Sequence, residues 1–333
     1  MSDAPHPSET KTLFGQDGPR ETLFSAIGSG RLHHAWLITG PRGTGKATLA
    51  WAAARELLGR DVSPERPEIA AISPSADPKT GRQRANILVD DIRGLKSRFA
   101  LSSPDEGWRI AIIDAADDMN VQAANALLKL LEEPPAKSLF FLISHQPAKL
   151  LPTIRSRCRE LRLSALQEAD FNAALEAAGH AQDGKLAALS GGAPGLAIAL
   201  GAGGGAVLYD KLVGLLDRRP MDRAMLSEIA EYCADRQNPE RFSGFIRLLS
   251  ILLTRLARAG AGAPPAPLSE GEARLFNHLS PDLQAAQIWA DLQSTLRQRL
   301  EAGRAVNLDP AQLVLDAGRR LDEAASRISV RAA

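Results

Sequence analysis

Residues 35–50 read AWLITGPRGTGKATLA, and this stretch decides the fold. An apolar run comes first, the turn GPRGTGK follows it, and a run with apolar residues at helical spacing comes last. A strand, a turn of the form G-x4-G-K and a helix, in this order, are the context that a phosphate-binding loop requires. The stretch therefore predicts a nucleotide site where a strand passes into a helix.

The turn supplies the groups that bind phosphate. Its glycines let backbone N–H groups point toward phosphate oxygens, the following helix N-terminus adds partial positive charge, and the lysine reaches the terminal phosphates. The residues predicted to bind in this way are Gly40, Gly43, Gly45 and Lys46. The alternative is a glycine-rich turn with a chance lysine, which the flanking strand and helix disfavour.

The position after the lysine departs from the usual pattern. Ala47 stands where a Ser or Thr hydroxyl would bind Mg²⁺. Thr48 carries a hydroxyl one residue later, about 100° further around the helix. The loop is therefore compatible with ATP or ADP, Mg²⁺ coordination is doubtful, and Thr48 is the remaining candidate hydroxyl.

Strand-like and helical runs alternate from Ala35 to Leu163. AWLITG, RIAIIDA, SLFFLIS and ELRL are strand-like, whereas ATLAWAAARELL and VQAANALLKLLEE are helical. This alternation predicts an α/β fold in which helices cover both faces of a parallel sheet. The second helical run is followed by two prolines, which end it, and its apolar spacing predicts a stripe that packs on the sheet. The stripe consists of Val121, Ala124, Leu127, Leu128 and Leu131.

Changes in composition mark the domain boundaries. Residues 1–12 predict a disordered tail, and residues 13–164 contain the α/β domain, in which the proline-rich segment 59–79 predicts a surface excursion. Residues 165–205 predict a small helical domain that ends in a glycine-rich break, and residues 206–333 predict a third, all-helical domain. Its apolar run FSGFIRLLSILLTRLARA requires broad burial, within its own bundle or against a partner.

The totals exclude several classes of protein. Forty basic and 39 acidic side chains leave a net charge of +1, so the whole chain has no general attraction to nucleic acid or to acidic lipid. The two cysteines, Cys158 and Cys233, form no paired zinc-ligand spacing and predict a reducing compartment. Neither a signal peptide nor a membrane span is evident, so we expect a cytoplasmic protein.

A carboxylate ends the run RIAIIDA. Asp114 stands where a buried strand would present it to a bound Mg²⁺, but Ala115 and Ala116 follow it in place of a glutamate that would polarise water. General-base catalysis contributes about 10² to 10⁴-fold, so hydrolysis here is expected to be slow. Asp117 and Asp118 are better explained as acidic residues at a helix start than as a replacement base.

Three arginines lie close together after the run SLFFLIS. Arg155, Arg157 and Arg159 form either a solvated basic patch or a functional segment. In the second interpretation, Arg157 is an arginine finger, whose guanidinium stabilises charge on a transferring phosphoryl group in a neighbouring subunit.

Taken in order, these motifs resemble the AAA+ clamp-loader subunits of bacterial DNA replication. NALLKLLEEPP and SRC are the most specific segments, LITGPRGTGK and GGAPGLA agree with them, and the resemblance covers nearly the whole chain. It implies a RecA-like AAA+ domain, a helical lid and a helical collar. It also implies a hetero-pentamer with gamma/tau motor subunits and a delta subunit, which uses ATP to open the sliding clamp and place it on primer-template DNA.

The resemblance also implies roles for individual residues. Arg157 would be the finger that enters a motor subunit's ATP site, and Ser144 or His145 would lie at the first sensor of the terminal phosphate. Gly195 lies near the place where motor subunits carry a lid arginine. The family's four-cysteine zinc module has no counterpart after residue 59, so no zinc is expected.

Ala47, Ala115 and Gly195 each replace a different element of hydrolysis. The resemblance is therefore to a family member whose own ATPase activity is weak or absent, and which acts as a component of the DNA-directed DNA polymerase holoenzyme. An active motor subunit, with Thr48 and Asp117 as substitutes, is the alternative. A phosphate-loop kinase is disfavoured, because no acceptor-substrate lid is evident. A helicase is disfavoured, because aromatic residues make up only 5% of the chain and no stacking surface for single strands is evident.

Overall fold

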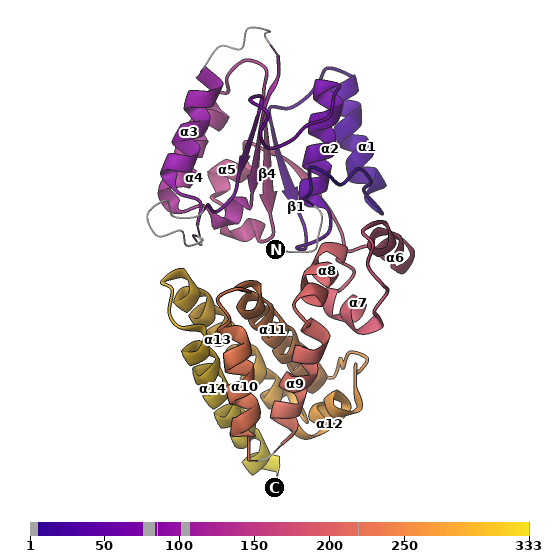
Figure 1. Cartoon of the computed structure of the whole chain (residues 1–333), viewed down its shortest axis with the longest axis vertical. Coiled ribbons are helices and arrows are strands. Elements are labelled where there is room, and N and C mark those ends of the chain that lie inside the picture. The colour runs from indigo at the N-terminus through magenta and orange to yellow at the C-terminus, as the bar shows by residue number, and fades with distance from the viewer. Residues whose placement is uncertain (1–5, 76–83, 85, 101–106, 219, 333) are drawn as a thin grey trace. The chain divides into compact units, whose positions relative to one another are not determined.

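Five strands form one parallel sheet in the order β2-β3-β4-β1-β5 (Figure 1). The strands are β1 (Ala35–Thr39), β2 (Ile69–Ile72), β3 (Arg109–Asp114), β4 (Ser138–Ser144) and β5 (Arg159–Arg162). The structure is a computed structural model that describes residues 6–75, 84, 86–100, 107–218 and 220–332. The predicted α/β class with a parallel sheet, a RecA-like AAA+ fold followed by helices, is confirmed.

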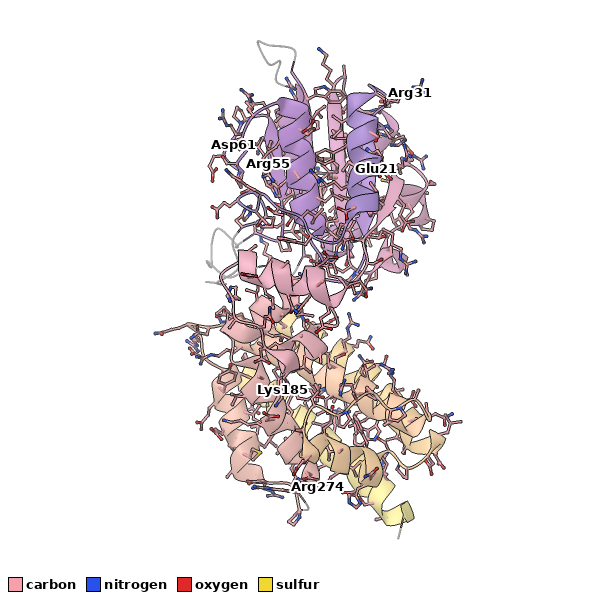
Figure 2. The ribbon with its side chains drawn as sticks, turned by 90° about the vertical axis from the view of Figure 1, so that its right-hand side faces the viewer. Glu21, Arg31, Arg55, Asp61, Lys185 and Arg274 are labelled. Carbon is pink, nitrogen blue, oxygen red and sulfur yellow. The ribbon has the colours of Figure 1, made fainter. Side chains whose placement is uncertain are left out.

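Helices cover both faces of the sheet because its central strands are apolar on both sides. Every residue of β4 is buried. On one face Leu49 and Trp51 pack with Trp36, and on the other Leu127 packs with Phe140. Figure 2 shows α1 and α2 side by side over the first face, with Glu21 and Arg55 labelled. The covering helices are α1 (Asp17–Gly28), α2 (Lys46–Leu58), α3 (Val89–Ala100), α4 (Val121–Glu132) and α5 (Pro152–Arg155).

The segment 59–79 was predicted as a surface excursion, and this prediction was wrong for its middle. Ile69–Ile72 forms β2, which pairs in parallel with β3, while residues 76–79 lie outside the described residues. Ile69 and Ala70 are buried, whereas the other two residues of β2 are not. A four-residue edge strand that is half buried and follows a proline-rich stretch has no periodicity that distinguishes it from a loop.

The predicted apolar stripe of α4 was wrong at its first member. Val121 is 70% exposed. The side chain of Asn120 caps the helix by accepting from the Ala123 amide, so Val121 lies in the open first turn. The buried face of α4 consists of Ala123, Ala124, Leu127, Leu130 and Leu131.

The described part of the predicted tail lies along α2. Arg55 donates hydrogen bonds to the carbonyl oxygens of Ser8, at 2.8 Å, and Thr10, at 2.9 Å. The His6 ring also meets the Trp51 ring edge-on, with centroids 5.9 Å apart. These contacts order residues 6–10 against the domain, which differs from the expectation of a disordered segment.

The chain divides into two compact units. One extends to Gln182 and includes Gly191–Leu196, and the other comprises Asp183–Ser190 and the chain from Ala197 onward. The helices after β5 are α6 (Glu168–Ala177), α7 (Gly184–Ser190), α8 (Pro194–Ala202), α9 (Gly205–Asp217), α10 (Arg223–Cys233), α11 (Glu240–Gly260), α12 (Glu270–Leu279), α13 (Leu283–Ala305) and α14 (Pro310–Ala332). The separation of a lid at 165–205 from a collar at 206–333 stays a prediction.

The second unit is built around α11. Its buried side chains are Phe242, Phe245, Ile246, Leu248, Leu249, Leu252, Leu253 and Leu256. α11 packs against α9, α12 and α13, so its own bundle buries this apolar face. Glu272 of α12 is fully buried and accepts hydrogen bonds from Tyr209 and Arg255, which joins α9, α11 and α12. In the described part of the chain no single helix is long and apolar enough to cross a membrane, although α8 and α9 together meet that criterion as a bent pair.

Candidate functional site

The predicted nucleotide-binding residues gather at the carboxyl edge of the sheet. Thr39, the last residue of β1, pairs with Ser144 of β4, and Asp114 of β3 pairs with Ile143. The phosphate loop follows β1 directly, and carboxyl ends of parallel strands form one edge where ligands bind. The fold therefore brings Gly40–Lys46, Asp114 and Ser144 to one place, although they are up to about a hundred residues apart in sequence.

The loop glycines have positive φ angles and close backbone neighbours. Gly40 has φ +137°, and a Cβ there would lie 2.2 Å from the carbonyl oxygen of Leu163. Gly43 has φ +82°, and a Cβ there would lie 2.4 Å from the amide nitrogen of Leu196. Both distances are far below van der Waals contact, so no other residue fits without moving the backbone. The glycines thus allow the chain's own backbone to approach the loop, in addition to any role toward phosphate.

Lys46 is turned onto its own loop. Its Nζ donates to the carbonyl oxygens of Gly40, at 2.8 Å, and Pro41, at 2.5 Å, and the residue is only 3% exposed. Burial lowers the pKa of Lys46 to about 8, while the nearby carboxyl of Asp114 opposes this shift. The ammonium is therefore held by main-chain oxygens at the position from which it would otherwise reach a phosphate.

Two carboxylates lie near this lysine. Burial raises the pKa of Asp114, and the positive charges of Arg42 and Lys46 act in the opposite direction. The carboxylate of Asp117 accepts from the His145 amide at 3.0 Å and so links the segment after β3 to the end of β4. Because this carboxylate is engaged in a structural hydrogen bond, Asp117 is poorly placed to act as a replacement base.

Ser144 has a buried hydroxyl with an open hydrogen-bonding capacity. The residue is 0% exposed, and its Oγ has no partner among the described residues. A buried hydroxyl without a partner costs free energy, so such a group at a ligand edge is a candidate contact for a ligand. Thr48 is half-buried on the first turn of α2, and the described residues provide no hydrogen bond to its hydroxyl. The binding roles of Ser144 and Thr48 stay predictions.

The segment around Gly195 contacts the phosphate loop directly. The amide of Gly195 donates to the carbonyl oxygen of Gly43 at 3.0 Å. A Cβ on Gly195 would lie 3.1 Å from the Cα of Gly43, which is tighter than an ordinary contact. A glycine at this position thus permits a backbone contact that an arginine would hinder.

The three arginines of the 155–159 segment differ in their surroundings. The guanidinium of Arg159 lies over the Trp36 ring, 4.9 Å from its centroid. Arg157 forms an ion pair with Glu132 at 2.8 Å and donates to the Thr153 carbonyl at 3.0 Å. Arg155 is exposed. The segment is therefore not a uniform basic patch, because each of these side chains has a different environment.

Gln16 is a residue that the sequence reasoning missed. It is 3% exposed, and its Nε2 donates to the carbonyl oxygens of Thr44, at 3.4 Å, and Ser164, at 2.8 Å. It thus joins the phosphate loop to the segment that follows β5. A lone glutamine before a helix carries no sequence signal for this role, because both partners are main-chain groups of distant segments.

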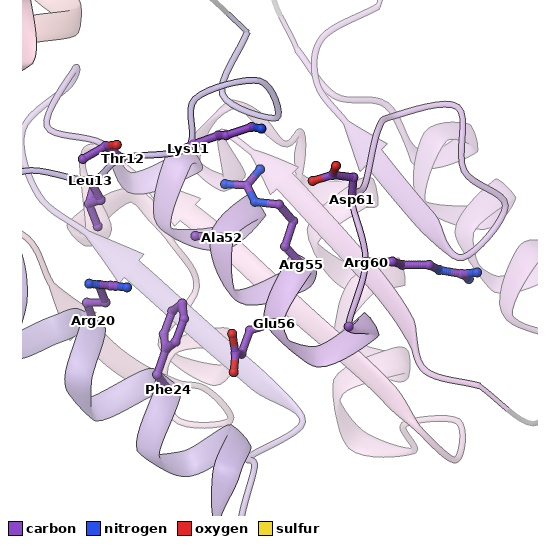
Figure 3. A pocket seen from close by; sticks show the side chains of 11 residues that line it. Lys11, Thr12, Leu13, Arg20, Phe24, Ala52, Arg55, Glu56, Arg60 and Asp61 are labelled. Carbon is purple, nitrogen blue, oxygen red and sulfur yellow. The ribbon is translucent and has the colours of Figure 1, made fainter. Parts of the chain in front are cut away.

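A cavity of about 700 Å³ lies between the N-terminal segment, α1 and α2 (Figure 3). Figure 3 shows Arg20 and Phe24 on α1 and Arg55 and Glu56 on α2 among its lining side chains. Leu13 lines the cavity and also packs against Gly45, so the cavity lies beside the phosphate loop. Its central cation, Arg55, is already bound to main-chain oxygens.

The described residues contain no group of three or more His, Cys, Asp or Glu side chains that could hold a metal ion. Both cysteines are free thiols, and burial raises the pKa of each to about 12. They are therefore neutral at physiological pH and weakly reactive.

A parallel five-stranded sheet with a phosphate loop after β1 and an acidic residue at the end of β3 defines a RecA-like domain of the AAA+ class. Residues 15–167 match the family model described as DNA polymerase III, delta subunit. Over this domain the chain is similar to the DNA polymerase III clamp-loader family, which confirms for residues 15–167 the resemblance inferred from its motifs.

Similar curated proteins carry names from that family. The chain is 36% identical over 159 residues to DNA polymerase III subunit delta' of Pseudomonas aeruginosa, and 32% identical over 160 residues to subunit delta' of Bacillus subtilis. It is 32% identical over 160 residues to subunit gamma/tau of Mycobacterium bovis. These alignments cover 42%, 44% and 45% of this chain and 46%, 46% and 28% of the relatives. The match thus spans less than half the length of each relative.

Solved structures of low sequence identity also align with this chain. A DNA polymerase III gamma subunit-related protein of Thermotoga maritima aligns with a TM-score of 0.45 and 18% identity, over 92% of this chain and 99% of that chain. The RuvB Holliday junction branch migration motor of the same organism aligns with a TM-score of 0.42 and 18% identity, over 86% and 92%.

Proposed function

We propose that this chain is a delta prime (δ′) subunit of the DNA polymerase III clamp loader, that it does not hydrolyse ATP appreciably, and that it supplies Arg157 to a neighbouring motor subunit. The names of its relatives support a clamp-loader role, and two of those relatives are delta' subunits. Its partners would be gamma/tau motor subunits and a delta subunit in a hetero-pentamer, which acts on the sliding clamp and primer-template DNA.

The state of the phosphate loop supports weak or absent hydrolysis. Lys46 is hydrogen-bonded to loop carbonyls, Ala47 lacks the hydroxyl that would bind Mg²⁺, and Ala115 lacks the carboxylate that would polarise water. If ATP or ADP binds, the loop amides and the Ser144 hydroxyl are the groups available to hold its phosphates. Mg²⁺ would have Asp114 as its candidate protein ligand.

The single observation that carries the finger role is the placement of Arg157. Arg157 lies two residues beyond the end of α5, its side chain is 36% exposed, and its guanidinium is fixed by two hydrogen-bonding partners. An accessible, oriented guanidinium is what a finger in trans requires, since it must meet phosphate oxygens of another subunit. Of its two neighbours, Arg159 is stacked on Trp36, and Arg155 is exposed.

Reconstitution tests this role. The chain is assembled with its motor and delta subunits, and DNA-stimulated ATP hydrolysis is compared for the wild type, Arg157→Ala and the matched control Arg155→Ala. Loss of a finger lowers the rate at its own site by about 10³ to 10⁵-fold, so the Arg157 variant should lose that site's share of turnover. The Arg155 variant should retain the wild-type rate. Equal rates for both variants would reject the finger role.

The alternative is an active motor subunit, because gamma/tau relatives are as similar as one of the delta' relatives. In that case the isolated chain would hydrolyse ATP in a Mg²⁺-dependent reaction that Lys46→Ala abolishes. Under the proposal, the isolated chain should hydrolyse almost no ATP, and Lys46→Ala should leave this low rate unchanged. A robust rate that depends on Lys46 would favour the motor role.

A further inference from the structure

Two partners on different elements hold the guanidinium of Arg157. Its Nη1 donates to the carbonyl oxygen of Thr153 at 3.0 Å, and its Nη2 pairs with Oε1 of Glu132 at 2.8 Å. The Glu132 side chain is 49% exposed, so both members of the pair can be reached from solvent. The arginine therefore has a defined orientation on an accessible surface.

Both partners rest on the same packed core. Glu132 is the last residue of α4, and Thr153 lies in α5. Leu131, next to Glu132, and Ile154, next to Thr153, are both buried in the apolar cluster that contains Leu127 and Phe140. Rigid elements that are tied to one core hold a side chain more precisely than loops do.

The position of Glu132 is unfavourable for the helix itself. A carboxylate in the last turn of a helix is disfavoured by the helix dipole, whereas a basic residue such as Lys129 is favoured there. The stability of α4 therefore does not account for a glutamate at this position, and the ion pair with Arg157 does.

We propose that Glu132 is a positioning residue for Arg157, which orders the guanidinium before it meets the ATP site of a neighbouring subunit; this inference rests on the proposed finger role. Guanidinium has five N–H donors, and the two contacts use two of them, so three remain for phosphate oxygens. Ordering a long arginine side chain costs rotamer freedom. The ion pair with Glu132 orders the arginine before assembly. Less rotamer freedom is then lost when the transition state forms, so the barrier to hydrolysis is lower.

The expected effect is modest, because exposed ion pairs bias a side chain only weakly. In the assembled complex, Glu132→Ala should lower kcat for DNA-stimulated ATP hydrolysis by about 2- to 5-fold and leave KM unchanged. Glu133→Ala is the matched control, since Glu133 is exposed and next in the chain, and it should leave kcat unchanged. The double variant Glu132→Ala/Arg157→Ala should be no slower than Arg157→Ala alone, because Glu132 acts through Arg157.

The outcomes separate this inference from the proposed function. If Arg157→Ala does not slow hydrolysis, the finger role fails and the role of Glu132 fails with it. If Arg157→Ala slows hydrolysis but Glu132→Ala matches Glu133→Ala, raises the rate, or adds to the loss in the double variant, only the positioning role is overturned. Thermal unfolding of each variant checks that the fold is retained, and a purely structural effect would lower the rate even without Arg157.

Discussion

At the scale of single residues, Lys46 has the clearest consequence for stability. Burial lowers its pKa from 10.5 to about 8. Between about pH 8 and pH 10.5 the unfolded chain, with its lysine near the ordinary pKa, binds more protons than the folded chain. The contribution of Lys46 to the free energy of unfolding should therefore rise with pH across this window, whereas below pH 8 the full cost of the buried charge is present.

The measurement compares denaturant unfolding of the wild type and Lys46→Met from pH 8 to pH 10.5. Other titrating groups are common to both proteins and largely cancel in the difference. The free energy of unfolding of the wild type minus that of the variant should increase by about 1–3 kcal/mol between pH 8 and pH 10.5. A difference that stays flat with pH would show that Lys46 titrates normally in the folded state.

Ser144→Ala tests the unpartnered hydroxyl. The wild-type chain buries this hydroxyl without a partner among the described residues, so removing it should leave the free energy of unfolding unchanged or raise it by up to about 1 kcal/mol. Chemical denaturation without nucleotide provides the measurement. A loss of more than about 1 kcal/mol would mean that the hydroxyl has a stabilising partner in the free chain.

Residues whose partners lie on distant segments, outside any motif of fixed spacing, were the hardest to predict. The loop glycines and Lys46 belong to a motif with fixed spacing, and the fold brings them to the sheet edge with Asp114 and Ser144. Gln16 and Glu132 carry no such spacing, since their partners lie on segments that only the folded chain brings near. The ion pair of Arg157 was likewise invisible in the sequence, although its NALLKLLEEPP and SRC segments were both recognised.

At the scale of elements, sequence patterns predicted four of the five strands, including the short edge strand β5, and missed β2. β1, β3 and β4 each have a continuous apolar, buried centre and lie where their runs predicted. β2 escaped prediction because its run, IAAI, lies inside a proline-rich, charged segment and buries only two of its four residues. Val121 was wrongly predicted to be buried because helical periodicity shows which face of a helix is apolar. It does not show whether the first turn extends past the elements that cover that face.

The contact between the Gly195 segment and the phosphate loop gives a prediction at this scale. Gly195→Ala should weaken the hydrogen bond from the Gly195 amide to Gly43, because the new Cβ would crowd the Gly43 Cα. A loss of about 1 kcal/mol is expected, seen as faster hydrogen exchange at the Gly195 amide. Gly184→Ala is the control, since a Cβ there meets nothing within 4 Å. Unchanged exchange in the Gly195 variant would contradict a stabilising contact.

At the scale of the whole molecule, the chain combines a sheet unit with the motifs and a helical unit without them. The match to the family model ends at residue 167 and so does not include the helical unit. The function of the helical unit is therefore part of the proposal. Its main helix, α11, is buried in its own bundle, so any surface for partners must come from the exposed side chains of the bundle.

Removing the helical unit tests whether it provides that surface. Both core clusters of the sheet unit lie between Leu23 and Leu163, so a chain that ends at Gly205 retains them complete and should keep its α/β fold by circular dichroism. If residues 206–333 form the collar, this truncated chain should no longer co-purify with the motor and delta subunits, whereas the full chain should. Because the Arg157 segment is kept, any ATPase stimulation should be lost through failed assembly and not through loss of the finger. Normal assembly by a folded, truncated chain would reject the collar role.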